Sequence, residues 1–314
     1  MRAVFLVIDG MADRCIATKE DLAAFFRQDG ADTTLGYFET CPKEFPPDSM
    51  VCLLTLLGVP ETQIPHTGRA WLEALGAGFQ VEKNGLAFRC SLVQVQNGKI
   101  LSPCAAGIVK KQRELLTRQL SRCFPKDKVQ FYPLEDYKSL LVLRDSEGEE
   151  SEIITHAPHE AAGRPVREAF PQGSGGAKLL RDACLKMLEE TDGKFLLLPW
   201  GQSAEHEIPG FTTLHGELSA AVCQTGIARG VALAMGMETP ELAHATSDTD
   251  TDLQEKLETI FSISEKYPFV FVHVNGADEA AHRRNAEEKT EFLKRVSREL
   301  VFPLLQKHDL RILI

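Results

Sequence analysis

The sequence lacks the features that mark several common classes of protein. No apolar run approaches the roughly 18 residues that a membrane-spanning helix needs, so no such helix is predicted. The chain starts directly with a strand-like apolar run, without the charged segment and cleavage site of a secretory signal peptide. It also lacks internal repeats and low-complexity segments.

Positive charge is scarce: 35 Lys and Arg residues stand against 45 Asp and Glu residues, for a formal net charge of -10. This balance argues against a nucleic-acid backbone or an anionic membrane as a partner. A small anionic metabolite remains compatible with an acidic chain, provided that a local basic cluster or metal ions offset the overall charge.

Paired cysteines are absent as well. The eight cysteines form no CxxC pair and are scattered through apolar contexts. In a chain of this length without a signal peptide, they indicate reduced thiols in a cytoplasmic protein.

What is present indicates a layered α/β fold. The length of 314 residues suits about two domains, and the 43% apolar and 25% charged content is that of a globular protein. Short, dense apolar runs predict strands buried on both faces of a parallel sheet: Ala3–Ile8, Phe195–Leu198, Phe269–Val274 and Leu310–Ile314. Segments with helical period alternate with them: Ala177–Glu190, Asp252–Glu265 and Asn285–Leu305, the last kinked or ended by Pro303.

The middle of the chain has a different pattern. Residues 79–144 contain short strand-like runs broken by polar turns, which is typical of a separate α+β unit. We therefore predict a core made of residues 1–78 and 170–314, with residues 79–169 inserted as a second domain.

Two carboxylates follow predicted strands. Asp9 ends the run Ala3–Ile8, and Asp278 follows the run Phe269–Val274 after a short loop. Ligands collect beyond the carboxyl ends of strands in open α/β sheets, so these side chains are expected to converge. His282, four residues after Asp278, would share its helix face, and such ligands suit Mn²⁺, Zn²⁺ or Mg²⁺. A plain Asp-Gly turn and a helix start with a surface histidine are the alternatives.

Ser49 precedes the apolar helical stretch Val51–Leu57. A serine at this place is a candidate nucleophile, since metal coordination lowers its hydroxyl pKa and a phosphate on it would meet a helix N-terminus. A pair of metal ions can stabilise both oxygens of an in-line phosphoryl transfer. The competing interpretation is that Ser49 is an ordinary N-cap.

Arg69 and Arg89 are the candidate anion-binding residues. Arg69 lies in the turn-like segment His66–Arg69, where a solvated arginine is the alternative. Arg89 lies inside a strand-like run and needs an anionic partner if it is buried. The acidic repeat Asp248–Asp252 lacks the glycine and terminal glutamate of a calcium loop, and we predict a helix N-terminal cluster there.

Together these segments resemble the archaeal-type, cofactor-independent phosphoglycerate mutases of the alkaline phosphatase superfamily. The resemblance covers nearly the whole chain. It rests mainly on the blocks Val7–Arg14, Thr67–Gly76, Asp250–Asp252 and His273–His282, which occur in the family's order.

The resemblance implies an alkaline-phosphatase-like core, mostly a parallel sheet flanked by helices, with an inserted α+β lid domain. Ser49 corresponds to the phosphorylated nucleophile of the family. Asp9 and Ser49 match ligands of one divalent ion, and Asp278 and His282 match ligands of the other. Both ions are expected to be Mn²⁺, with Zn²⁺ or Mg²⁺ as alternatives.

The sequence also departs from the family pattern. The polar residues that follow the family's serine are replaced here by Met50–Leu53. The family's remaining metal ligands follow a strand equivalent to Leu310–Ile314, so the second metal site is incomplete in this chain, and we expect the natural protein to continue beyond Ile314. Interconversion of 3- and 2-phosphoglycerate through a phosphoserine is the leading hypothesis. A homoserine-kinase-like or phosphatase relative and a pseudoenzyme without the second metal site are the alternatives, and the sequence leaves open whether the protein is a homo-oligomer.

Overall fold

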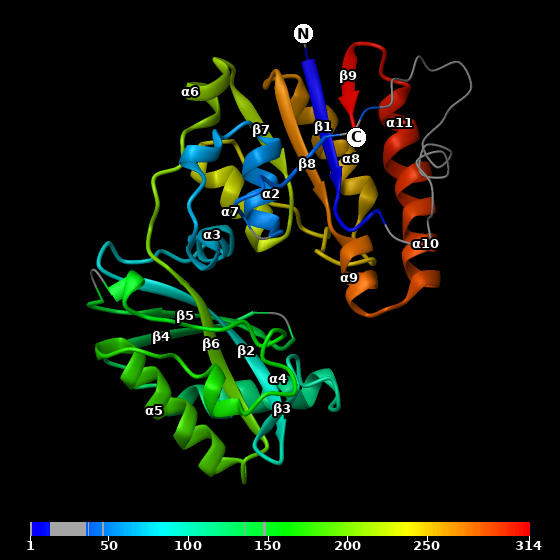
Figure 1. Ribbon diagram of the computed structural model, residues 1–314. Helices are drawn as coiled ribbons and strands as arrows, with labels where there is room; N and C mark the ends of the chain where they lie inside the picture. The colour runs from blue at the N-terminus through cyan, green and yellow to red at the C-terminus, as the bar shows by residue number, and fades with distance from the viewer. Residues whose placement is uncertain (1, 13–35, 37, 46, 135, 147–148) are drawn as a thin grey trace. The chain divides into compact units, whose positions relative to one another are not determined.

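The computed structural model describes residues 2–12, 36, 38–45, 47–134, 136–146 and 149–314. It forms two compact units: unit 1 comprises Met1–Ile64 and Ile208–Ile314, and unit 2 comprises Pro65–Glu207 (Figure 1). Asp13 and Arg14 of the first family-like block lie outside the described residues.

Unit 1 contains a parallel four-stranded sheet. The strands are β1 (Arg2–Ile8), β7 (Ser219–Val222), β8 (Phe269–Val274) and β9 (Leu310–Leu313), in the order β7-β8-β1-β9. They lie side by side in Figure 1, and all three strand pairs are parallel. Three of the four apolar runs predicted as parallel strands are therefore confirmed, and β7 was not predicted.

The two faces of this sheet bury different side chains. Val4 and Leu6 of β1 and Val272 of β8 belong to a core with α8 (Leu253–Ser264) and α10 (Ala286–Val296). The opposite face carries the aromatic pair Phe5 and Phe271 together with His273. Further helices of unit 1 are α2 (Ser49–Leu56), α6 (Phe211–His215), α7 (Gly226–Ala234) and α9 (Gly276–His282). Of these, α2 packs against α7.

The helix predicted over Asn285–Leu305 has an irregular middle. Asn285 caps α10, a π-helical segment follows at Ser297–Val301, and α11 covers Phe302–Leu305. Pro303 has no amide hydrogen and its ring crowds the carbonyl four residues earlier, so a wider turn before it relieves the clash. The predicted irregularity is confirmed, and it lies just ahead of the proline.

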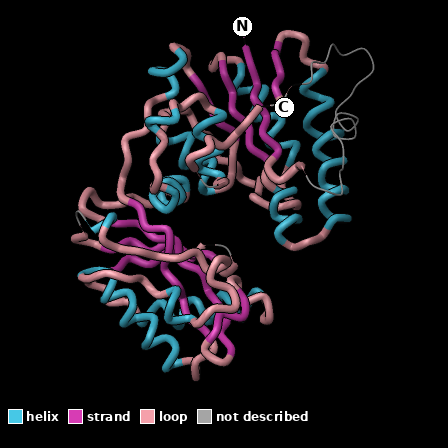
Figure 2. The backbone as a smooth tube through the Cα atoms, viewed as in Figure 1, coloured by secondary structure: helices cyan, strands magenta, loops and turns pink. Residues whose placement is uncertain are grey.

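Unit 2 is built on an antiparallel sheet, drawn in magenta in Figure 2. Its strands are β2 (Leu86–Gln96), β3 (Lys99–Ser102), β4 (Val129–Pro133), β5 (Lys138–Leu143) and β6 (Phe195–Ser203). The order is β3-β2-β5-β4, with β6 paired to β2. The helices are α3 (Arg69–Gly76), α4 (Lys110–Leu120) and α5 (Gly175–Glu190). Short 3-10 turns of unit 2 lie at Ser121–Cys123 (η2), Glu149–Ser151 (η3) and Val166–Ala169 (η4), and unit 1 has one at Glu61–Gln63 (η1).

One predicted strand belongs to a different sheet. Phe195–Leu198 was predicted in the parallel sheet, but β6 runs antiparallel to β2 in unit 2, with Leu197 opposite Leu92. An apolar run predicts that a strand is buried on both faces, but it does not predict which strand lies beside it. Here α5 packs on β6 and buries it. Because β6 completes this sheet, the compact unit spans Pro65–Glu207 instead of the predicted insertion at 79–169. Its role as a lid stays a prediction.

No helix among the described residues is long and apolar enough to cross a membrane.

Candidate functional site

The first part of the site is the contact between the end of β1 and the start of α9. The Asp9 amide donates to the carbonyl of Val274 at 2.9 Å, which extends the pairing of β1 and β8 by one residue. Gly10 has φ +70°, and a Cβ atom there would lie 2.4 Å from Cα of Asp278. Only glycine fits this close backbone approach. The structure thus brings together the Asp9 and Asp278 segments, as the sequence predicted.

Asp9 faces a buried histidine. Nε2 of His273 lies 3.4 Å from Oδ2 of Asp9, and the His273 side chain is 1% exposed whereas that of Asp9 is 32% exposed. Nδ1 of His273 lies 3.4 Å from Oγ1 of Thr225, the residue that caps α7. The imidazole therefore bridges a helix start and the strand-end carboxylate.

A buried lysine supports the same strand end. Nζ of Lys256 donates to the His273 carbonyl at 3.4 Å, and the Lys256 residue is 1% exposed. Burial lowers the pKa of Lys256 to about 8, an effect that the neighbouring Cys223 and Glu255 partly offset. Burial also raises the pKa of the Cys223 thiol to about 12. The polar groups behind Asp9 are thus held in a dry environment.

Asp278 and His282 form the second donor pair. Both lie on α9, and Nε2 of His282 is 3.3 Å from Oδ2 of Asp278. The His282 side chain is 74% exposed. The predicted sharing of one helix face is confirmed, and the exposed imidazole is accessible to a ligand.

Ser49 is the first residue of α2, and it is half-buried. The cap of this helix is Asp48, whose Oδ1 accepts the Met50 amide at 2.8 Å. The interpretation of Ser49 as the N-cap is therefore wrong. Its position on the first turn of an eight-residue helix leaves its hydroxyl available for another role.

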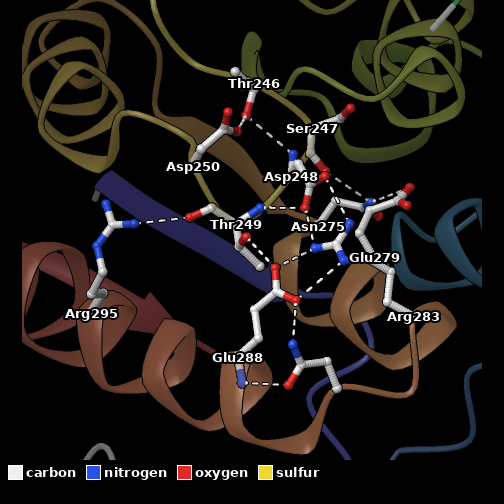
Figure 3. A network of polar contacts seen from close by, with 11 residues as sticks. Thr246, Ser247, Asp248, Thr249, Asp250, Asn275, Glu279, Arg283, Glu288 and Arg295 are labelled. Atoms are coloured by element: carbon white, nitrogen blue, oxygen red, sulfur yellow. Dashed lines mark hydrogen bonds and ion pairs between the residues drawn. The ribbon is translucent and has the colours of Figure 1, made fainter. Parts of the chain in front are cut away.

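The charge of Arg283, next to His282, is compensated locally (Figure 3). Its guanidinium donates to both carboxylate oxygens of Asp248, at 2.9 and 2.7 Å, and to both oxygens of Glu288, at 2.6 and 3.2 Å. These hydrogen bonds raise the pKa of Arg283 and lower that of Glu288. Asp248 of the acidic repeat thus binds Arg283. Asp252, at the other end of the repeat, caps α8, as predicted for a helix start.

Unit 2 contains a separate cationic cluster. Nε of Arg69 donates to Oε1 of Glu73 at 2.9 Å, and Nε of Arg89 donates to Oε2 of the same carboxylate at 3.0 Å. Burial would raise the pKa of Glu73, but Arg89 and Arg69 outweigh it and hold that pKa below its usual value. The Arg89 guanidinium also stacks on Trp200, 4.1 Å from the ring centroid. The structure brings the two predicted arginines together on one carboxylate.

A second carboxylate in unit 2 is held by polar neighbours. Glu150 accepts hydrogen bonds from the Thr67 hydroxyl at 2.6 Å and the Ala204 amide at 3.0 Å, and its Oε1 lies 3.1 Å from Nε2 of His206. Burial alone would raise the pKa of Glu150, but these partners, His206 foremost, bring it down to about 2. His206 thus takes part in this cluster.

Comparison with known proteins identifies the family. The model of the 2,3-bisphosphoglycerate-independent phosphoglycerate mutases matches residues 31–192, just over half of the chain. The chain belongs to this family. A 2,3-bisphosphoglycerate-independent phosphoglycerate mutase of Methanosarcina acetivorans is 28% identical, over 98% of this chain and 81% of the relative. One of Methanopyrus kandleri is 27% identical, over 98% of this chain and 80% of the relative.

Solved structures share the fold. A Pyrococcus horikoshii protein matches with a TM-score of 0.68 and 19% identity, over 99% of this chain and 80% of that one. A cofactor-independent phosphoglycerate mutase from Thermoplasma acidophilum matches with a TM-score of 0.51 and 18% identity, over 99% of this chain and 86% of that one. The predicted α/β, alkaline-phosphatase-like fold is confirmed.

The donor atoms of Asp278 and His282 have a spacing that fits a divalent ion. Two donors about 2.1 Å from one ion at tetrahedral or octahedral angles lie about 3.0 to 3.4 Å apart, and the Asp278–His282 separation of 3.3 Å falls in that range. Among the residues that the structure describes, however, no group of three His, Cys, Asp or Glu side chains is arranged to hold a metal. The spacing of the pair is compatible with part of a coordination shell.

Two of the polar residues described above escaped the sequence analysis. Glu73 could have been found from its spacing, since it lies four residues after Arg69 in α3 and such a pair meets on a helix. His273 could have been noticed as the one polar residue in the strand FVFVHV. The contact of His273 with Asp9 could not have been predicted, because this contact depends on the register of β1 and β8. In that register His273 lies opposite Val7.

Proposed function

We propose that the protein interconverts 3- and 2-phosphoglycerate through a phosphoserine at Ser49. Membership in the phosphoglycerate mutase family supports the reaction. The observation that carries the assignment of the site is the Gly10–Asp278 approach, which packs two carboxylate-bearing segments at adjacent strand ends. Such strand ends are where α/β proteins bind their ligands.

In this proposal the phosphoryl group moves twice. The Ser49 hydroxyl attacks the phosphorus of 3-phosphoglycerate, a new P–O bond forms at Oγ, and the bond to the substrate's 3-oxygen breaks. The 2-hydroxyl of the bound glycerate then attacks the phosphoserine, and Ser49 is regenerated. The positive end of the α2 helix dipole would stabilise the phosphate on Ser49, while the Met50 amide is bound to Asp48.

A divalent ion is part of the proposal. Asp278 and His282 would hold one ion, and Asp9 with Ser49 would contribute to another. When bound, such an ion lowers the pKa of a coordinated hydroxyl and offsets the charge of the phosphoryl oxygens. His273 would help to position the Asp9 carboxylate, since its Nε2 lies 3.4 Å from Oδ2 of Asp9 and neighbouring polar groups orient ligating carboxylates.

Arg69 and Arg89 would bind the anionic groups of the substrate, with unit 2 acting as the lid. Both guanidinium groups donate to the Glu73 carboxylate, so two cationic side chains lie together on a half-buried surface. A cluster of this kind gives an acidic protein the local positive charge that a phosphorylated metabolite requires.

An enolase-coupled assay with Mn²⁺ and 3-phosphoglycerate tests the proposal on the natural full-length protein. We expect turnover in the wild type, loss of turnover in Ser49→Ala, and full turnover in Ser262→Ala, which removes an exposed serine of α8. Intact-mass measurement should find one covalent phosphate on the wild type and none on Ser49→Ala.

The outcomes separate the competing functions. Turnover that persists in Ser49→Ala would overturn the role of Ser49. Release of inorganic phosphate without 2-phosphoglycerate would identify a phosphatase, and phosphorylation of homoserine from ATP would identify a kinase. Folded, metal-loaded protein that shows none of these activities would be a pseudoenzyme.

A further inference from the structure

A basic segment lies in unit 2 between α4 and β4. Residues 110–128 contain seven Lys or Arg residues and two acidic residues, Glu114 and Asp127, which gives a local charge of +5 in a chain whose net charge is -10. The segment covers α4, the turn η2 and the approach to β4. Such concentration of positive charge in an acidic protein indicates an anionic ligand.

Part of this charge is already compensated. Arg113 is hydrogen-bonded to both carboxylate oxygens of Asp136, and Nζ of Lys128 lies 3.1 Å from Oδ2 of Asp145. By contrast, Arg118, Arg122 and Lys126 form no ion pair with any residue in the described part of the chain. All three are exposed.

These three cations line one hollow of about 350 Å³. Its remaining wall is apolar and aromatic: Phe124 is buried, Phe131 is half-buried, and their rings stack at 5.7 Å between centroids. A hollow of this size lies at the lower end of the range for small-molecule sites. Its lining thus combines three cationic side chains and Ser121 with the apolar residues Phe124, Val129, Phe131 and Pro133.

We propose that this hollow binds a mononucleotide. Its phosphates would be bound by Arg118, Arg122 and Lys126, because guanidinium groups form strong charge-assisted hydrogen bonds with phosphate. Its base would pack on the wall that Phe131 contributes, since aromatic side chains stack on bases of any kind. This site does not depend on the proposed mutase reaction, and none of its lining residues belongs to the candidate catalytic site.

Calorimetric titration with ATP in EDTA tests the proposal on the full chain. We expect saturable binding at one site, weakened at least about tenfold in the double variant Arg118→Gln/Arg122→Gln, because one lost charge-assisted hydrogen bond is worth about that factor. The matched control Lys110→Gln/Lys111→Gln removes the same charge from exposed positions at the start of α4, outside the hollow. Its affinity should stay within about twofold of the wild type.

Three further titrations separate the alternatives. Phe131→Leu should weaken ATP binding and leave tripolyphosphate binding unchanged. Equal affinity of the wild type for ATP and tripolyphosphate would overturn the nucleotide assignment, as would equal weakening by both double variants. Displacement of ATP by 3-phosphoglycerate would assign the binding to the candidate catalytic site, and absence of ATP binding at millimolar concentration would also overturn the proposal.

Discussion

The imidazole of His273 and the carboxylate of Asp9 lie 3.4 Å apart, with the histidine buried in β8 and the aspartate at the end of β1. The strand that carries His273 is otherwise apolar, so the imidazole has a cost in desolvation that its polar neighbours must offset. Oγ1 of Thr225 lies 3.4 Å from Nδ1, and Oδ2 of Asp9 lies at ion-pair distance from Nε2, which has no hydrogen-bond partner among the described residues. The His273–Asp9 pair therefore links a buried side chain of the sheet to the candidate metal-binding carboxylate.

Replacing His273 by leucine should impair metal binding more than folding. Leucine fills much of the buried space but removes the polar group that faces Asp9, and loss of such a partner of a ligating group typically costs 10- to 100-fold in metal affinity or activity. We expect Mn²⁺ affinity, measured by calorimetry, and mutase turnover to fall by about that range. His308→Leu, at an exposed position, is the control. Unchanged Mn²⁺ affinity in folded His273→Leu would show that the contact has no role in positioning Asp9.

The sequence was sufficient for three of the four strands of the parallel sheet and for the Asp9–Asp278 approach. Both follow from short apolar runs that end in polar residues, because the carboxyl ends of parallel strands lie on one edge of the sheet. It was insufficient for β6, whose apolar residues would be equally buried in either sheet. Nor could it give the contact of Arg283 with Asp248, 35 residues away in sequence. Contacts at such separation depend on loop conformations that local patterns do not encode.

The Arg69–Glu73–Arg89 cluster should couple substrate binding to stability. In Arg89→Met, the Glu73 side chain, only 13% exposed, loses one of its two cationic partners, so we expect unfolding to become easier by about 1–3 kcal/mol. We also expect KM for 3-phosphoglycerate to rise about tenfold or more with a smaller change in kcat, as for lost ground-state binding. Urea unfolding and the coupled assay measure the two effects. Arg164→Met, an exposed arginine of unit 2, should change neither, and equal behaviour of the two variants would contradict the role of Arg89.

Glu150 should make the protein sensitive to acid. Its pKa of about 2 in the folded state lies below the ordinary value of 4.5. The unfolded chain therefore takes up a proton first as the pH falls, and the stabilising contribution of Glu150, complete above about pH 4.5, is lost progressively toward pH 2. Urea unfolding between pH 6 and pH 3 should show a shallower pH dependence for Glu150→Gln than for the wild type. The exposed control Glu160→Gln should follow the wild type, and parallel curves for Glu150→Gln and the wild type would contradict the prediction.

Lys256 should make the stability of the protein depend on pH in the alkaline range. Burial brings its pKa to about 8, below the ordinary 10.5, so at neutral pH the folded protein carries a buried ammonium group at a cost in stability. Between these two values the folded state gives up its proton while the unfolded state keeps it, and the free energy of unfolding therefore rises with pH, by on the order of 3 kcal/mol. Lys256→Met should remove this rise, which urea unfolding from pH 7 to pH 10 would measure as a difference from the wild type. Lys266→Met, at an exposed position just beyond α8, should keep it, because its ammonium group is hydrated in both states. If the free energy of unfolding of Lys256→Met rises with pH as much as that of the wild type, the ammonium group of Lys256 is hydrated in the folded protein. That result would also contradict the dry environment inferred behind His273 and Asp9.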